Sequence, residues 1–214
     1  MAEPNKTTRA YEAIEGMITF QELVPGSLIS EAMLMERTGL GRTPVREALQ
    51  RLARERMVEI HPNRGVFVPP ASIEAQLKLL ELRRSLEALA VRLATHRALA
   101  EQKRHMQEVI EQFRRGVPDA RAFDAILKQA HALIVEAAHN EYLSVAMAPL
   151  QGLSRRFWFA HLRDPESELR AASRLHGDIL GAICHGDETE AVTASTRLND
   201  YLVDFAYATL NPPG

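Results

Sequence analysis

The chain has 214 residues, of which 46% are hydrophobic and 25% charged, and its formal net charge at pH 7 is −2. This composition is typical of a folded globular protein and excludes a disordered or collagen-like chain. No apolar run approaches the roughly 18 residues that a membrane span needs, and a single cysteine, Cys184, excludes an intrachain disulfide. We expect a cytoplasmic protein with one large domain or two small ones.

The charge is distributed unevenly along the chain. Residues 37–64 carry seven arginines against Glu47, Glu55 and Glu59, a local net charge of +4, whereas residues 1–36 carry −4. A short basic block in a nearly neutral chain suggests an anionic partner such as nucleic acid. On charge alone, the block is also compatible with an ordinary solvated helix.

The first 70 residues are predicted to form helices followed by a β-hairpin. Apolar spacing and turn-forming residues predict, in chain order, a helix around Tyr11–Ile18, a turn at 24–27, helices at 30–38 and 43–56, and strands at 57–61 and 66–68. Thr43 is a candidate N-cap, and Pro44 suits the first helical position. Consecutive prolines then break regular structure, which predicts a domain boundary at 69–73.

From residue 74 onward no strand pattern appears. The next helix has leucines spaced alternately by three and four residues, as an amphipathic helix should: Leu79, Leu82, Leu86, Leu89 and Leu93. Further helices are expected at 101–115, 119–138, 141–161, 166–185 and 187–210. We therefore predict a mainly α protein, with a winged helix-turn-helix and small β-hairpin in residues 1–70 and an all-α six-helix bundle in residues 71–214.

The helix predicted at 43–56 has two chemically distinct faces. Its apolar residues are expected to pack inward: Val45, Ala48, Leu49 and Leu52. Thr43, Arg46 and Gln50 lie on another face, with Arg42 just before the first turn. Such a helix can enter the major groove of DNA, where Arg pairs with guanine and Gln with adenine through two hydrogen bonds. The alternative is that these polar residues are only solvated.

The segment LGRTPVREALQRL at 40–52, with HPNRGVFV at 61–68 and VPG at 24–26, resembles the GntR family of bacterial transcriptional regulators. The resemblance implies that Arg42, Thr43 and Arg46 contact operator DNA. It also implies that Arg64 and Gly65, at the tip of the wing, approach the minor groove or the backbone. Gly41 departs from the family, which usually has Ser or Thr there, so one hydroxyl available to a phosphate is missing.

The second part resembles the FadR-type (FCD) branch of that family, in the segment LRRSLE at 82–87, in 131–140 and around 175–187. Many members bind a divalent metal through one Asp and three His. His131 and His176 match two of these positions, but Leu127 and Leu198 stand at the other two. Because a zinc site usually needs three or four protein ligands, a metal is disfavoured.

Two other interpretations of His131 and His176 remain open. They are hydrogen-bonded core histidines, or they line an apolar effector cavity. Arg83 either binds a carboxylate of the effector or forms a surface ion pair with Glu87. The cluster Phe157–Phe159, preceded by Arg155 and Arg156, is expected in the core or in a dimer interface.

The expected function is that of a ligand-responsive regulator, a repressor, that binds a pseudo-palindromic operator as a homodimer. Its effector would be a small organic metabolite of carboxylate type. The alternatives are a helical domain that binds a divalent metal or that serves dimerisation only. No constellation of a nucleophile or acid–base pair with an activating partner is evident, so we expect no enzyme and no catalytic residues.

Overall fold

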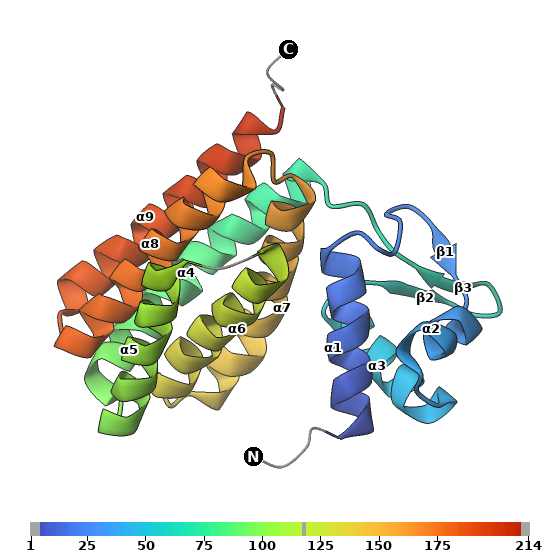
Figure 1. Ribbon diagram of the computed structural model, residues 1–214, viewed down its shortest axis with the longest axis horizontal. Helices are drawn as coiled ribbons and strands as arrows, with labels where there is room; N and C mark the ends of the chain where they lie inside the picture. Colours follow the sequence, from blue (N-terminus) through green and yellow to red (C-terminus); the bar gives the residue numbers. More distant parts are fainter. Residues whose placement is uncertain (1–4, 117–118, 211–214) are drawn as a thin grey trace. The chain divides into compact units, whose positions relative to one another are not determined.

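The computed structural model describes residues 5–116 and 119–210, which form nine helices and three short strands (Figure 1). The chain divides into two compact units. The first comprises residues 1–72 together with 152–160, and the second comprises 73–151 and 161–214. The mainly α fold with a small antiparallel sheet confirms the predicted fold class. The division differs from a single cut at 69–73, because a segment distant in sequence joins the first unit.

The first unit contains a three-helix cluster and a small sheet. Its helices are α1 (Lys6–Thr19), α2 (Glu31–Thr38) and α3 (Arg42–Arg54), and its strands are β1 (Leu28–Ile29), β2 (Glu59–His61) and β3 (Gly65–Phe67). The strands pair antiparallel in the order β1-β3-β2. The predicted hairpin is therefore present, and β1 adds an unpredicted strand to its edge.

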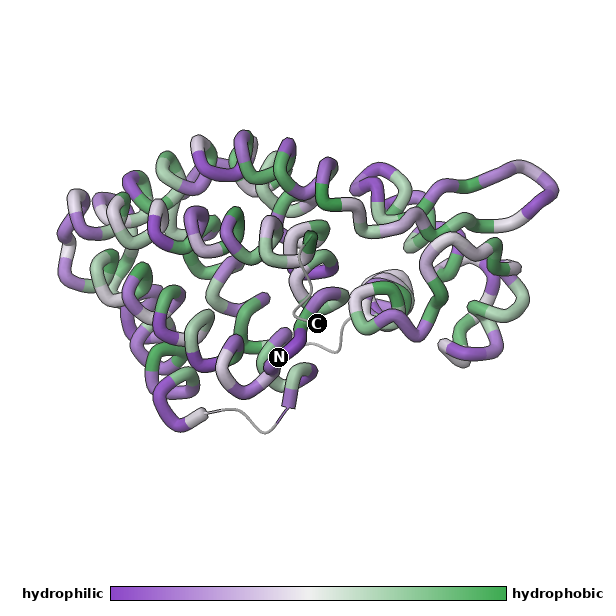
Figure 2. Tube along the Cα trace, turned by 90° about the horizontal axis from the view of Figure 1, so that it is seen from above, coloured by the Kyte–Doolittle hydropathy of each residue, from purple (hydrophilic) through white to green (hydrophobic). Residues whose placement is uncertain are grey.

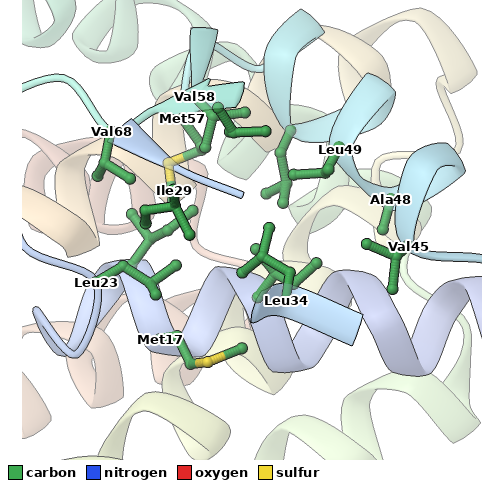
Figure 3. Close-up of a cluster of buried hydrophobic side chains, with 14 of the residues drawn as sticks. Met17, Leu23, Ile29, Leu34, Val45, Ala48, Leu49, Met57, Val58 and Val68 are labelled. Atoms are coloured by element: carbon green, nitrogen blue, oxygen red, sulfur yellow. The ribbon is translucent and has the colours of Figure 1, made fainter. Parts of the chain in front are cut away.

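Buried apolar side chains from the three helices, from β1 and β3 and from the loops beside the strands form one core, against which Ile60 of β2 packs half-buried (Figure 3). Leu34 of α2 and Leu49 of α3 are each 1% exposed, and Val68 after β3 is fully buried. Burying one such side chain stabilises the fold by about 1.5–3 kcal/mol. The core thus fixes the orientation of α3, whose opposite face is left toward solvent.

The start of α3 corrects one prediction. The helix begins at Arg42, and Gly41 is its N-cap, without a capping side-chain hydrogen bond. Thr43 lies inside the first turn and is not the N-cap. Pro44 is tolerated there, because the first four backbone N–H groups of a helix have no intrahelical acceptor.

The second unit is a helical bundle built from α4 (Ile73–Arg97), α5 (Ala100–Arg115), α6 (Ala120–Ala137), α8 (Pro165–His185), α9 (Glu188–Ala208) and the first part of α7 (Glu141–Ala160). Aspartates cap three helix starts: Asp119, Asp164 and Asp187 each accept a backbone N–H of the first turn. Hydrophobic and hydrophilic residues alternate along the bundle helices, as their amphipathic packing requires (Figure 2).

The leucine stripe of α4 does not face the bundle interior. Leu82 is 53% exposed and Leu89 is 36% exposed. The inward face of α4 instead carries a mixed set of buried residues: Gln76, Leu80, Arg83, Glu87, Ala90, Val91 and Ala94. The regular leucine spacing therefore marks an apolar face of α4 that is distinct from its buried face.

None of the helices in the described ranges combines the length and hydropathy needed to cross a membrane.

Candidate functional site

The outer face of α3 presents four of the residues predicted to contact DNA. Arg42, Thr43, Arg46 and Gln50 are exposed. The inner face is fully packed, with Val45, Ala48, Leu49 and Leu52 at most 1% exposed. This contrast, set by the 3.6-residue period, leaves the polar side chains on one accessible surface.

Arg46 has an acidic neighbour on α2. Its Nε lies 3.4 Å from Oε1 of Glu31, and the side chains are 63% and 34% exposed, respectively. An exposed pair of this kind contributes little to stability. The guanidinium therefore remains available to a stronger anionic partner such as a phosphate or a guanine edge.

Arg51, on the same helix, has a structural role instead. Its guanidinium lies 3.7 Å from the centroid of the Tyr11 ring, and its Nε donates to Glu55 at 3.0 Å. The Tyr11 hydroxyl donates to the same carboxylate at 2.6 Å. Burial, together with the adjacent Glu55 carboxylate, raises the pKa of Tyr11. The arginines of α3 thus have two roles: Arg42 and Arg46 face solvent, whereas Arg51 contacts Tyr11 of α1.

The wing tip is a tight turn between β2 and β3. Arg64 is exposed, and its backbone N–H donates to the His61 carbonyl at 3.1 Å. Gly65 has a φ of +113°, and a Cβ at this position would lie 2.6 Å from the carbonyl oxygen of Ile29. A side chain would therefore separate β1 from β3, so the sheet requires glycine here irrespective of any DNA contact.

The second unit contains a buried ion pair next to the predicted effector residues. Arg83 donates to Glu87 through Nε at 2.9 Å and through Nη2 at 3.3 Å, and the two side chains are only 3% and 2% exposed. Asn199 of α9 donates to the same carboxylate at 3.1 Å. Of the two alternatives for Arg83, the i,i+4 pair is the one that forms in this structure, but it is buried rather than on the surface.

His131 and His176 are brought together beside this pair. Their ring centroids are 5.4 Å apart, and the residues are 3% and 5% exposed. Nδ1 of His176 lies 2.8 Å from the Ala172 carbonyl, so Nδ1 carries the proton and Nε2 keeps its lone pair. Burial lowers the pKa of His176 to about 4, which leaves this imidazole neutral near pH 7.

The two leucines at the remaining metal-ligand positions are also buried, Leu127 at 5% and Leu198 at 0% exposure. Within the described residues, no group of three or more His, Cys, Asp or Glu side chains is placed to hold a metal ion. Two imidazoles supply neither the ligand number nor the negative charge that a divalent cation needs. The residues present do not fit a metal centre.

Sequence reasoning missed two members of this buried polar cluster, Glu87 as a core residue and Asn199. The available signal was the 3–4 spacing of Leu80, Arg83, Glu87 and Ala90, which places the charged pair on the same helix face as apolar residues.

Two family descriptions match the chain. "Bacterial regulatory proteins, gntR family" matches residues 6–68, and "FCD domain" matches residues 78–200. The Nta operon transcriptional regulator of Aminobacter aminovorans is 30% identical over 167 residues, which cover 78% of each chain. The galactonate operon transcriptional repressor of Escherichia coli is 25% identical, over 91% of this chain and 93% of its own.

Solved structures show the same fold. Escherichia coli McbR/YncC superposes with a TM-score of 0.80 at 20% identity and covers 98% of this chain and 100% of its own. A putative regulator of Rhodococcus sp. RHA1 superposes with a TM-score of 0.67, also at 20% identity, covering 98% and 99%. The curated relatives named above are transcriptional regulators rather than enzymes.

Proposed function

Because the chain belongs to the gntR family of bacterial regulatory proteins and carries an FCD domain, we propose that it is a ligand-responsive transcriptional repressor that binds a pseudo-palindromic operator as a homodimer. The observation that carries this proposal is the outer face of α3, where four polar side chains stand exposed over a fully buried apolar face. The repressor mode is supported by the name of the galactonate operon relative.

In this proposal α3 enters the major groove N-terminus first. Arg42 and Thr43 lie in its first turn, where free backbone N–H groups and the helix dipole favour phosphate. Arg46 and Gln50, one and two turns further on, reach base edges, and each good bidentate contact contributes about 1–3 kcal/mol of discrimination. Arg64 and Gly65 at the wing tip approach the minor groove or the backbone.

The homodimer is proposed to form through the leucine stripe of α4. Leucines spaced alternately by three and four residues form the heptad repeat of coiled coils, in which the apolar seam of one helix packs against a partner helix. In this chain that seam points away from its own bundle, with Leu82 and Leu89 exposed. A second copy presenting the same seam covers both stripes through a two-fold axis, which matches a palindromic operator.

The effector is proposed to bind in the buried polar cluster lined by Arg83, His131 and His176. Among the described residues, two buried acceptor atoms there have no hydrogen-bond partner, Nε2 of His176 and Oδ1 of Asn199. Leaving a buried acceptor unsatisfied costs about 1–3 kcal/mol. A small organic acid that also carries hydroxyl groups satisfies these acceptors, while its carboxylate competes with Glu87 for Arg83.

Binding of the effector regulates the protein only through different affinities for the DNA-bound and free states. A carboxylate that displaces Glu87 from Arg83 changes the contacts between α4 and α9, because Asn199 also bonds to Glu87. A helical domain that serves dimerisation alone is the second candidate, and the exposed leucine stripe favours it.

The test is fluorescence anisotropy with a labelled duplex from the region upstream of the protein's own gene. The double variant Arg42→Ala/Arg46→Ala should bind at least about tenfold more weakly, because two phosphate or base contacts are lost. The matched control, Arg92→Ala/Arg104→Ala, removes two exposed arginines from the bundle and should bind as the wild type does. Unchanged affinity of the first variant would count decisively against the DNA-reading role of α3.

The effector is tested separately by a thermal-shift screen of organic acids and hydroxy acids. A ligand that binds only the folded protein raises its melting temperature. Hits that disappear in His176→Leu support the buried site, whereas the absence of any hit leaves dimerisation as the role of the helical domain.

A further inference from the structure

A surface pocket of about 530 Å³ lies between α5 and α8, within the second unit. We propose that this pocket binds a small amphipathic anion, at a site separate from the buried histidine pair and independent of the DNA-binding role. Its volume lies within the roughly 300–1,000 Å³ that is usual for small-molecule sites.

The floor of the pocket is apolar. Ile110 and Phe113 of α5 and Leu169 of α8 line it, with Phe113 buried and the other two half-buried. An apolar floor favours a ligand with a hydrocarbon or aromatic part, because burying that part removes apolar surface from water.

The rim of the pocket is rich in arginine: Arg114, Arg115, Arg170 and Arg174. Arg114 pairs with Glu111 at 2.6 Å, and Arg170 pairs with Glu166. Among the described residues, Arg115 and Arg174 have neither a hydrogen bond nor an ion pair. Glu166 and Asp178 also line the pocket, so with Glu111 three carboxylates accompany the four arginines and one positive charge remains in excess.

Two unpaired guanidinium groups over an apolar floor define the chemistry of the ligand. Arg115 ends α5 and Arg174 lies in the middle of α8, so the two approach the pocket from different helices. Guanidinium groups bind carboxylate and phosphate through paired, charge-assisted hydrogen bonds. The ligand is therefore an anion with an apolar body, and not a bare inorganic ion or a neutral apolar molecule.

Phe113 separates this pocket from the histidine pair. Its ring centroid lies 6.2 Å from that of His176 and 5.9 Å from that of Phe123. Phe113 thus lines the pocket and is also a ring neighbour of His176. A ligand in the pocket would contact this side chain without entering the buried polar cluster.

The test is isothermal titration calorimetry of the full chain with phenyl phosphate, which has an aromatic body and a dianionic head. Inorganic phosphate and benzyl alcohol serve as the charge-only and the apolar-only probes. We expect saturable binding of one phenyl phosphate per chain, and at least about tenfold weaker binding of either control compound.

The variant Arg115→Gln/Arg174→Gln should weaken phenyl phosphate binding at least about tenfold. The matched control Arg92→Gln/Arg104→Gln removes the same charge elsewhere on the bundle and should leave binding unchanged. The proposal is overturned if the wild type shows no saturable binding, if both double variants lose affinity equally, or if neither does. Because operator binding is not measured, failure here is distinct from failure of the regulator proposal.

Discussion

Arg155 and Glu15 form a buried ion pair inside the first unit. Nη2 of Arg155 donates to Oε1 of Glu15 at 2.8 Å, and the side chains are 10% and 2% exposed. Arg155 belongs to residues 152–160, the end of α7 that the first unit incorporates. The aromatic rings of Phe20 and Phe159 lie 5.0 Å apart beside it. The end of α7 is therefore part of the unit that contains α3.

Replacing Arg155 by Met should destabilise the first unit by about 3–5 kcal/mol, because the Glu15 carboxylate would stay buried without its cation. The double variant Glu15→Met/Arg155→Met should recover most of this loss, since both charges are then absent. Urea unfolding followed by the fluorescence of Trp158, the only tryptophan, reports on this unit. As a control, Arg170→Met breaks an exposed pair with Glu166 and should change the free energy of unfolding by less than about 1 kcal/mol. Equal effects of the two single variants would contradict the structural role of the buried pair.

Gly65→Ala should destabilise the first unit by about 1–3 kcal/mol, because its φ of +113° is unfavourable for alanine and the added Cβ would meet the Ile29 carbonyl at 2.6 Å. Gly16→Ala in α1 is the matched control, because a Cβ there meets nothing within 4 Å. In a helix that change should stabilise by about 0.5–1 kcal/mol. Urea unfolding at constant pH measures both. Opposite signs are expected, and a neutral Gly65→Ala would show that β1 does not constrain the wing.

Stability should fall as the pH drops from about 6.5 toward 4, because burial lowers the pKa of His176 to about 4 in the folded state. Between these pH values the unfolded chain binds a proton at His176 that the folded chain does not. The contribution of the neutral imidazole to the free energy of unfolding is therefore fully present above the unfolded pKa and is lost as the pH falls toward the folded pKa. The upper limit is about 3 kcal/mol. Differential scanning calorimetry at pH 7.5 and 5 measures the loss of stability in the wild type and in His176→Gln. The titration of carboxylates is common to both proteins and cancels when the two losses are subtracted.

The control for this pH effect is His185→Gln, which removes an exposed imidazole from the same helix. It should keep the pH profile of the wild type. A His176→Gln profile as steep as that of the wild type would show that another group causes the acid sensitivity.

Leu82→Glu/Leu89→Glu should convert the proposed dimer into a monomer, since charged side chains then meet across the two-fold axis of the α4 seam. Sedimentation velocity at micromolar concentration measures the oligomeric state. Val145→Glu places a charge at a residue of α7 that is 77% exposed and should leave the dimer intact. A monomeric wild type, or a dimer that persists in the double variant, would place the interface elsewhere or remove it.

The exposed polar face of α3 could be predicted from sequence, because Val45, Ala48, Leu49 and Leu52 fix the buried side of the helix and thereby the opposite side. Strand β1 could not be predicted, because a strand of two residues is too short to show the alternation of apolar and polar side chains. The burial of the Arg83–Glu87 pair was not predicted, because charged residues are rarely buried, although the pair shares a helix face with Leu80 and Ala90. The incorporation of 152–160 into the first unit has no local signal either, because the contacts of Arg155 are made with residues 140 positions away.

Removing divalent cations with a chelator should leave the melting temperature of the wild type unchanged. The reason is that Leu127 and Leu198 occupy the two positions where metal-binding relatives are expected to have ligands, and both are buried among apolar side chains. Differential scanning fluorimetry before and after dialysis against EDTA measures the effect. A fall of several degrees would mean that a metal contributes to the fold.

The same positions allow the converse experiment. Leu127→Asp/Leu198→His restores four ligands, because position 127 lies one helical turn before His131 and so on the same face. With a carboxylate and three imidazoles available, the double variant should bind one Zn²⁺ per chain, and Zn²⁺ should raise its melting temperature. Leu127→Asp alone should be less stable than the wild type, because it buries a charge without a metal to balance it. Metal content after gel filtration, determined by mass spectrometry, gives the stoichiometry. If the double variant also remains metal-free, the two histidines do not share the geometry of the family's metal centre, and their pairing has to be understood as packing within an organic ligand site.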